Sequence, residues 1–400
     1  MSQSYVKEPP TLTDSARAVL RAIATDGPAT RPQLSAALQF SKPTMSAAVS
    51  ELEKYGFLTP AGVNRGNVGR TSITYSIGSK AGLVIGVDCG TTRIHAIATG
   101  IDGLQVAEVE TTYEPLPDSQ RFERVETVLS DILAKCPAQR CDLSCIVIAL
   151  PNMISPTLAR LPNRQRFLDV LARLSETYQV PILLENNVNC AALAEYHQGA
   201  ARDHSFAVYM QIGVNVGMGI VIDGKLFRGF KGGAGEIAHL PFPWSESEQP
   251  APLGVESYLG AKALLERAGE TWKSTAQEAP GDTSKLFAIV ESEPTASMIV
   301  DRHARDIGNL AAACVSVLDP ELIVVGGGVG QNARLLPEIR NTVERLCWPV
   351  DIVVGELSNK ATVVGAVRLA MDFALARLLG ENAKAAFLFS PDQASRLVSL

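Results

Sequence analysis

The chain has 400 residues, of which 46% are hydrophobic and 20% charged, and its formal net charge at pH 7 is −6. This length exceeds what one hydrophobic core serves, and the composition is that of a soluble globular protein with two or three domains. The sequence offers neither a signal-peptide core nor an apolar run long enough to span a membrane, and its seven cysteines are typical of reduced thiols, so we expect a cytoplasmic protein.

Charge is unevenly distributed along the chain. Residues 1–80 carry nine Lys or Arg side chains against five Asp or Glu, whereas the remainder is acidic. A small basic segment joined to an acidic one indicates that only the basic segment contacts a polyanion. We call residues 1–78 the head and the rest of the chain the body.

Three helices are predicted in the head. Apolar residues recur at helical spacing in residues 16–23. Thr30 and Gln33 have the spacing of a capping box and start a short second helix. Ser41 is the expected cap of a third helix, which ends at Gly56. This succession predicts a helix-turn-helix.

The third helix and the segment after it predict DNA binding. The outward face of the helix carries small or basic groups that fit a major groove, and a loop with glycine and arginine then joins two β-prone runs, as in a wing. The residues expected to contact DNA are Ser41, Lys42, Thr44, Ser46, Ser50, Arg65 and Arg70. The same pattern also allows a three-helix module for protein contacts with a solvated loop.

The body contains three segments in which glycines follow a strand. Residues 83–92 form a predicted buried strand and a tight turn, and a similar strand and turn return at residues 206–217. A third glycine run ends the segment 319–328. Two strand–turn–strand units about 120 residues apart indicate a duplicated fold with a cleft between its halves. In such folds the turns hold nucleotide phosphates on backbone N–H groups.

In this order the segments resemble the ROK family, which contains repressors, uncharacterised reading frames and sugar kinases. Residues 84–103 resemble its first phosphate motif and residues 184–195 its catalytic loop. Residues 233–239 resemble its Gly-Glu-x-Gly-His signature, and residues 319–328 its adenosine motif. The resemblance covers essentially the whole chain.

The resemblance implies an α/β protein. A winged helix-turn-helix, residues 1–78, precedes a two-lobed actin/hexokinase-like (ribonuclease H-like) fold of the ATPase type. The first lobe is expected at residues 79–190 and the second at residues 191–400, with the C-terminal helix returning to the first lobe. Such lobes are hinged around a sugar and nucleotide cleft.

The resemblance also implies binding sites. Carboxylates, amides and imidazole suit the vicinal hydroxyls of a sugar. The residues expected to bind a sugar are Asn152, Asn186, Asn187, Glu236, His239 and Glu256. The Asn pair is expected in the first lobe, and Glu236 and His239 in the second. A degenerate nucleotide site is expected at Asp88, Gly90, Thr91, Gly213, Gly217 and Gly327.

The sequence departs from the family's kinases at the positions that carry the chemistry. Asn187 occupies the position of the catalytic Asp, and an amide cannot act as a general base, so we expect no catalytic residue. Glu185 is the adjacent carboxylate that could replace it. Val214 and Asn215 alter the second phosphate turn, so nucleotide binding is expected to be weak or absent and no cofactor is expected.

A metal site is not expected either. Many family members bind zinc through a histidine and a cysteine-rich loop, but residues 241–255 contain no cysteine. Cys136, Cys141 and Cys145 lie within ten residues of one another, and core packing is the preferred interpretation of that cluster.

The sequence therefore predicts a sugar-responsive transcription regulator, a repressor or, less often, an activator. Its expected partners are double-stranded operator DNA and a small sugar or sugar derivative. A homodimer or homotetramer is expected, because paired half-sites require a two-fold protein. Two alternatives stay open: an active ROK-type sugar kinase with an appended DNA-binding head, and a ligand-independent regulator whose body only dimerises the head.

Overall fold

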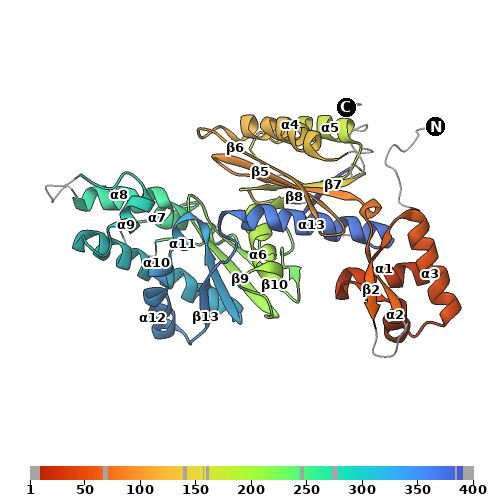
Figure 1. The fold of residues 1–400 in the computed structure, drawn as a ribbon. Helices are drawn as coiled ribbons and strands as arrows, with labels where there is room; N and C mark the ends of the chain where they lie inside the picture. Colours follow the sequence, from red (N-terminus) through yellow and green to blue (C-terminus); the bar gives the residue numbers. More distant parts are fainter. Residues whose placement is uncertain are drawn as a thin grey trace. The chain divides into compact units, whose positions relative to one another are not determined.

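The computed structural model describes residues 10–65, 71–137, 142–155, 157–158, 162–243, 247–272, 278–382 and 385–390. The chain divides into two units (Figure 1): unit 1 comprises residues 1–150, 157–185 and 366–400, and unit 2 comprises residues 151–156 and 186–365. The head therefore belongs to unit 1. The division lies between residues 185 and 186 rather than at 190, and the segment from residue 366 onward lies in unit 1.

The described part of the head contains α1 (Asp14–Asp26), β1 (Ala29–Thr30), α2 (Arg31–Leu38), α3 (Lys42–Tyr55), β2 (Leu58–Arg65) and β3 (Thr71–Ile77). The predicted helix signals are confirmed. Thr30 and Gln33 form the capping box of α2. Ser41 caps α3, which ends at Gly56 with a φ of 71°. The strands pair antiparallel in the order β1-β3-β2, which gives a winged helix-turn-helix, and the tip of the wing at residues 66–70 lies outside the described residues.

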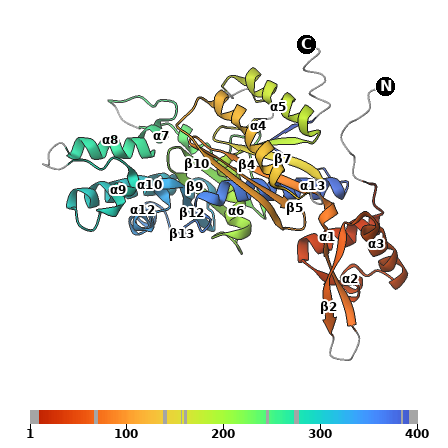
Figure 2. The same cartoon turned by 45° about the horizontal axis from the view of Figure 1, so that its top comes forward.

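The three head helices lie against one another (Figure 2) and share an apolar core. Its side chains are buried and include Ala16, Val19, Leu20, Ile23, Leu34, Met45, Val49, Leu52 and Tyr75. Burying one such large side chain stabilises the fold by about 1.5–3 kcal/mol. The core uses one side of α3, so the opposite side of that helix faces solvent.

The body part of unit 1 is a six-stranded sheet in the order β14-β8-β7-β4-β5-β6. Its elements are η1 (Ser79–Ala81), β4 (Leu83–Cys89), β5 (Arg93–Gly100), β6 (Gln105–Thr112), α4 (Asp118–Lys135), β7 (Leu143–Leu150), α5 (Arg164–Tyr178), β8 (Ile182–Asn186), α13 (Ala361–Leu378) and β14 (Phe387–Phe389). Helices α4 and α5 lie over one face and α13 lies across the other (Figures 1 and 2). The thiol of Cys145 in β7 donates to the carbonyl of Ala370 in α13 at 3.3 Å, which shows how closely α13 packs.

Unit 2 is a five-stranded sheet in the order β11-β10-β9-β12-β13 with helices on both faces. Its elements are α6 (Asn187–Gln198), β9 (Phe206–Ile212), β10 (Val216–Ile222), β11 (Lys225–Leu226), η3 (Ile237–His239), α7 (Gly254–Leu259), α8 (Ala261–Trp272), α9 (Thr283–Ala288), α10 (Pro294–Leu318), β12 (Leu322–Gly326), α11 (Gly327–Gly330), η4 (Ala333–Leu335), α12 (Leu336–Leu346), β13 (Asp351–Val354) and η5 (Ser358–Lys360). Alternate side chains of β9 serve two cores: Tyr209 packs toward α6, and Val208 and Met210 pack toward α10 and α12.

The cysteines of the described segments are free thiols, and all except the half-buried Cys347 are buried. Burial raises the pKa of Cys145 to about 12, which suits a packing role. Cys141 lies outside the described residues.

Within the described ranges no three His, Cys, Asp or Glu side chains gather as they would around a metal ion. None of the helices described has the length and apolar character to span a membrane.

One buried histidine of unit 2 predicts a pH dependence. His303 in α10 is 1% exposed, and its Nδ1 lies 3.2 Å from Nη2 of Arg267. Burial, and then the charge of Arg267, lower the pKa of His303 to about 3. The folded chain therefore keeps this imidazole neutral at pH values where an unfolded chain, with an ordinary histidine pKa of about 6.5, binds a proton.

We predict that His303 makes the protein less stable as the pH falls below about 6.5. Between pH 7 and pH 5 its share of the loss is about 2 kcal/mol of unfolding free energy, because only the unfolded state gains the proton. Urea unfolding at both pH values should show a smaller loss for His303→Gln than for the native chain. His239→Gln, at an exposed histidine, is the control. Equal losses in the native chain and His303→Gln would contradict the prediction.

Candidate DNA-binding face and effector site

The solvent side of α3 carries the side chains that the sequence predicts to contact DNA. Those described in full are exposed: Ser41, Lys42, Thr44, Ser46 and Ser50. Ser41 Oγ accepts the backbone N–H of Thr44 at 3.3 Å and lies 2.8 Å from its Oγ1, so these two hydroxyls also hold the start of α3. The backbone of Arg65 ends β2, but its side chain is not described, and Arg70 lies outside the described residues.

Most of the described cations of the head have internal partners, which the sequence did not indicate. Arg31 pairs with Glu53 at 3.3 Å and lies over the ring of Tyr75. Lys54 lies 5.9 Å from the ring centroid of Tyr55. Lys42, at the first turn of α3, has no ion-pair partner among the residues described. The charge that Lys42 carries is thus available for a phosphate group.

Asn186 organises the start of α6. Its Oδ1 accepts the backbone N–H groups of Val188 and Asn189 at 2.8 and 3.2 Å, and its Nδ2 donates to the carbonyl of Asn152 at 3.1 Å. Asn152 and Asn186 are thereby brought together, and both belong to unit 2. The predicted placement of the Asn pair in the first lobe is therefore wrong, because these bonds tie α6 and the residue 152 turn to the same unit.

The loop at residues 232–236 packs against the segment that follows Asn152 and against β10. A Cβ added at Gly232, whose φ is 80°, would lie 2.3 Å from the carbonyl oxygen of Ile154. A Cβ at Gly235, whose φ is 84°, would lie 2.0 Å from that of Met218. These approaches require glycine. They bring the loop that carries Glu236 beside the residues that follow Asn152.

The other residues that the sequence offered for the sugar site differ in their exposure to solvent. Asn187 opens α6 and is partly exposed, and its carbonyl accepts the hydroxyl of Thr362 at 3.4 Å. His239 ends η3 and is exposed. Glu185, the carboxylate considered as a replacement base, is 1% exposed within β8. Burial of that carboxylate disfavours its use on a substrate.

Glu256 binds the second phosphate turn. Its Oε2 accepts the backbone N–H of Val216 at 3.0 Å and Nδ2 of Asn215 at 3.3 Å. The sequence did not indicate this link, because residues 215 and 256 are far apart in the chain. A carboxylate at these donors occupies an N–H group of the turn and repels a phosphate group that approaches it.

The first phosphate turn is also paired within the chain. Asp88 is 7% exposed, and Nη2 of Arg93 lies 3.3 Å from its Oδ2. Burial raises the pKa of Asp88, and Arg93 opposes that rise. The hydroxyl of Tyr113 donates to the carbonyl of Gly90 at 2.6 Å, and the adjacent Thr91 is partly exposed.

The remaining glycines of the expected nucleotide site serve close packing. A Cβ at Gly213 would lie 3.2 Å from the backbone nitrogen of Gly328, so the second turn abuts the third glycine run. A Cβ at Gly327, whose φ is 86°, would lie 2.6 Å from the carbonyl oxygen of Ile212. One at Gly217 would lie 3.0 Å from Val188. Gly213 and Gly327 thus pack closely against backbone, and Gly217 packs against the Val188 side chain.

Comparison with known proteins identifies the family. The sequence model of the ROK family matches residues 84–372, so the chain belongs to the ROK family. A putative xylose repressor of Caldicellulosiruptor sp. (strain Rt8B.4) is 26% identical over 383 residues, which cover 90% of this chain and 95% of that protein. A glucokinase of Streptomyces coelicolor is 27% identical over 329 residues, which cover 73% of this chain and 98% of that protein.

A solved structure supports the predicted fold. The crystal structure of a ROK family transcriptional regulator, described as a homolog of the E. coli MLC protein, matches with a TM-score of 0.73 at 18% identity. The match covers 92% of this chain and 98% of that one. The predicted α/β fold is confirmed.

We predict that Lys42 neutralises a DNA phosphate. Lys42→Ala should weaken binding to a duplex found by mapping the sites that this protein occupies, and should lower the slope of log affinity against log salt by about one unit. Lys54→Ala, which removes the same charge at the other end of α3, is the matched control. Unchanged salt dependence in Lys42→Ala, or an equal loss in both variants, would refute the assignment.

Proposed function

We propose that this ROK-family chain is a sugar-responsive, DNA-binding repressor whose kinase-like body does not phosphorylate its ligand. The observation that carries the proposal is a capped helix-turn-helix with an exposed polar recognition face, joined to a body with Asn187 at the position of the catalytic base. The lengths matched in the relatives support it. The repressor pairs with 90% of this chain, whereas the glucokinase, matched over 98% of its own length, leaves part of this chain without a counterpart.

On the DNA side, α3 enters the major groove and the β2–β3 wing contacts the adjacent minor groove. Lys42 binds a phosphate, and Ser46 and Ser50 face the base edges. One good base contact contributes ~1–3 kcal/mol of discrimination, so a single head has modest specificity. Two heads on paired half-sites supply the rest, which requires a homodimer or a homotetramer. The proposed location is the cytoplasm, where the operator lies.

On the effector side, the ligand is a sugar or a sugar derivative bound in unit 2. The loop of Glu236, the start of α6 with Asn187 and the exposed His239 supply groups that accept and donate hydrogen bonds in fixed directions, as vicinal hydroxyls require. The buried Oδ1 of Asn152 has no hydrogen-bond partner among the described residues, so it can accept a hydrogen bond from a hydroxyl. Xylose and glucose are the first sugars to test, because they are named for the repressor and kinase relatives.

The absence of phosphoryl transfer follows from three features of the chain. Asn187 cannot take a proton from an attacking hydroxyl. Glu256 binds the backbone N–H of Val216 in the second phosphate turn. Asp88, at the end of β4 beside the first turn, is buried and paired with Arg93.

We predict no sugar phosphorylation. A coupled ADP-release assay with a panel of pentoses and hexoses should give no turnover, with an active glucokinase as the positive control. Asn187→Asp alone should not restore activity, since Glu256 still binds the second phosphate turn and Arg93 still pairs with Asp88 beside the first. Turnover on the order of 1 s⁻¹ or faster in the native chain would establish the kinase alternative instead.

We predict that a sugar stabilises the folded protein through unit 2. A ligand at a hundred times its Kd adds about 2.7 kcal/mol to the unfolding free energy, which a thermal-shift screen over the same panel detects. Glu236→Gln should abolish the shift. Arg166→Gln, at an exposed arginine of α5, is the control. If no sugar of the panel shifts the unfolding temperature, the ligand-independent regulator becomes the better description.

A further inference from the structure

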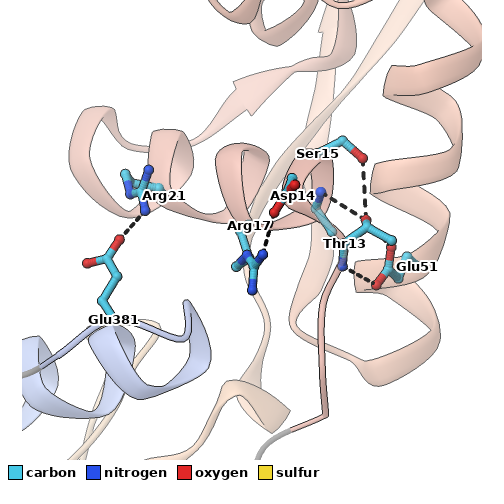
Figure 3. A network of polar contacts seen from close by, with 8 residues as sticks. Thr13, Asp14, Ser15, Arg17, Arg21, Glu51 and Glu381 are labelled. Carbon is cyan, nitrogen blue, oxygen red and sulfur yellow. Dashed lines mark hydrogen bonds and ion pairs between the residues drawn. The ribbon is translucent and has the colours of Figure 1, made fainter.

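The end of the chain contacts the first helix of the head. After α13, Gly380 adopts a φ of 68°, and the backbone N–H of Glu381 donates to the carbonyl of Ala376 at 2.8 Å. This turn directs the carboxylate of Glu381 toward α1, where it accepts a hydrogen bond from Nη2 of Arg21 (Figure 3). The side chains of Arg21 and Glu381 are 54% and 44% exposed.

The same helix α1 is bound to α3, the helix proposed to enter the major groove. The backbone N–H and hydroxyl of Thr13, the N-cap of α1, donate to the carboxylate of Glu51 in α3 at 3.0 and 2.5 Å (Figure 3). The apolar side of α1 is buried in the head core. Because α1 and α3 share this core and this cap, a force on Arg21 moves the recognition helix as well.

The other end of α13 is bound to α6, the helix that begins at Asn187. Residues 361–365 of α13 belong to unit 2, and the rest of the helix belongs to unit 1. Within unit 2, Thr362 donates to the carbonyl of Asn187 at 3.4 Å, and a Cβ at Gly365 would lie 1.7 Å from the carbonyl oxygen of Cys190. The first turn of α13 therefore packs directly against α6, whose first residues carry the proposed effector contacts.

We propose that α13 couples effector binding at α6 to the orientation of the head, and that Arg21 and Glu381 are the positioning residues at the head end of this path. The inference rests on the proposed function. A ligand that displaces α6 displaces the start of α13, and the ion pair passes the displacement to α1 and on to α3. Because both side chains are half exposed, the ion pair accounts for only part of the coupling, about a two- to fivefold change in affinity.

The test is amide hydrogen exchange of α6 with and without a bound DNA duplex. Coupling is reciprocal, so DNA bound at the head must change the exchange of residues 187–190 in the native chain, and this readout needs no identified sugar. Arg21→Glu and Glu381→Arg should each reduce that change, and the double variant with exchanged charges should restore it. Glu381→Arg matters most, because it breaks the pair without removing a cation from the head.

A matched ion pair in unit 1 supplies the control. Arg166 and Glu123 join α5 to α4 at 2.6 Å and are 52% and 39% exposed, close to the values for Arg21 and Glu381. Exchanging their charges should leave the response of α6 unchanged.

Operator affinity with and without xylose or glucose, whichever stabilises the protein, gives a second readout. The factor by which the sugar changes operator affinity should fall by about two- to fivefold in each single variant and recover in the double variant. A native chain that binds DNA without any change in α6 would overturn this inference, as would single variants that respond like the native chain. A native chain that binds no DNA would instead overturn the proposed function.

Discussion

The close approach of α13 to the backbone of both units is the constraint on which the remaining contacts depend. A Cβ at Gly86 in β4 would lie 2.4 Å from the backbone nitrogen of Val367, and one at Gly365 would lie 1.7 Å from the carbonyl oxygen of Cys190. Side chains at either position would force α13 away from its neighbour. With glycine at both, one helix packs on the sheet of unit 1 and on α6 of unit 2. Its end then reaches the head.

What the sequence could predict was decided by distance along the chain. The capping box at Thr30 and Gln33 and the cap at Ser41 are local, so their spacing was sufficient to place α2 and α3. The division between the units was misplaced because Asn186 bonds to Asn152, across 34 residues. Likewise the pairs Glu256–Val216 and Arg21–Glu381 join segments with no common pattern, and only the folded chain shows them.

The candidate site shows how groups of a kinase-like fold become occupied within the chain. A ligand-binding polar group must be satisfied by a ligand, by water or by the protein. Here Arg93 pairs with Asp88, the backbone N–H of Val216 donates to Glu256, and the backbone at the start of α6 donates to Asn186. Motif resemblance singles out these residues, but it cannot tell a group that awaits a ligand from one that already has a partner. The motif therefore predicts the fold better than it predicts the function.

The weakness of the ion pair between Arg21 and Glu381 suits its proposed role in regulation. An exposed ion pair contributes ~0–1 kcal/mol, whereas each large apolar side chain of the head core contributes about 1.5–3 kcal/mol. A ligand shifts an equilibrium only by its differential affinity for the two states, typically ~1–3 kcal/mol. Such a ligand can overcome one half-exposed pair, but not an apolar interface of several side chains. A head bound to α13 through a buried core would follow the body in every state and could not report the effector. In the proposed coupling, the half-exposed pair of Arg21 and Glu381 is weak enough for a small ligand to select between head orientations.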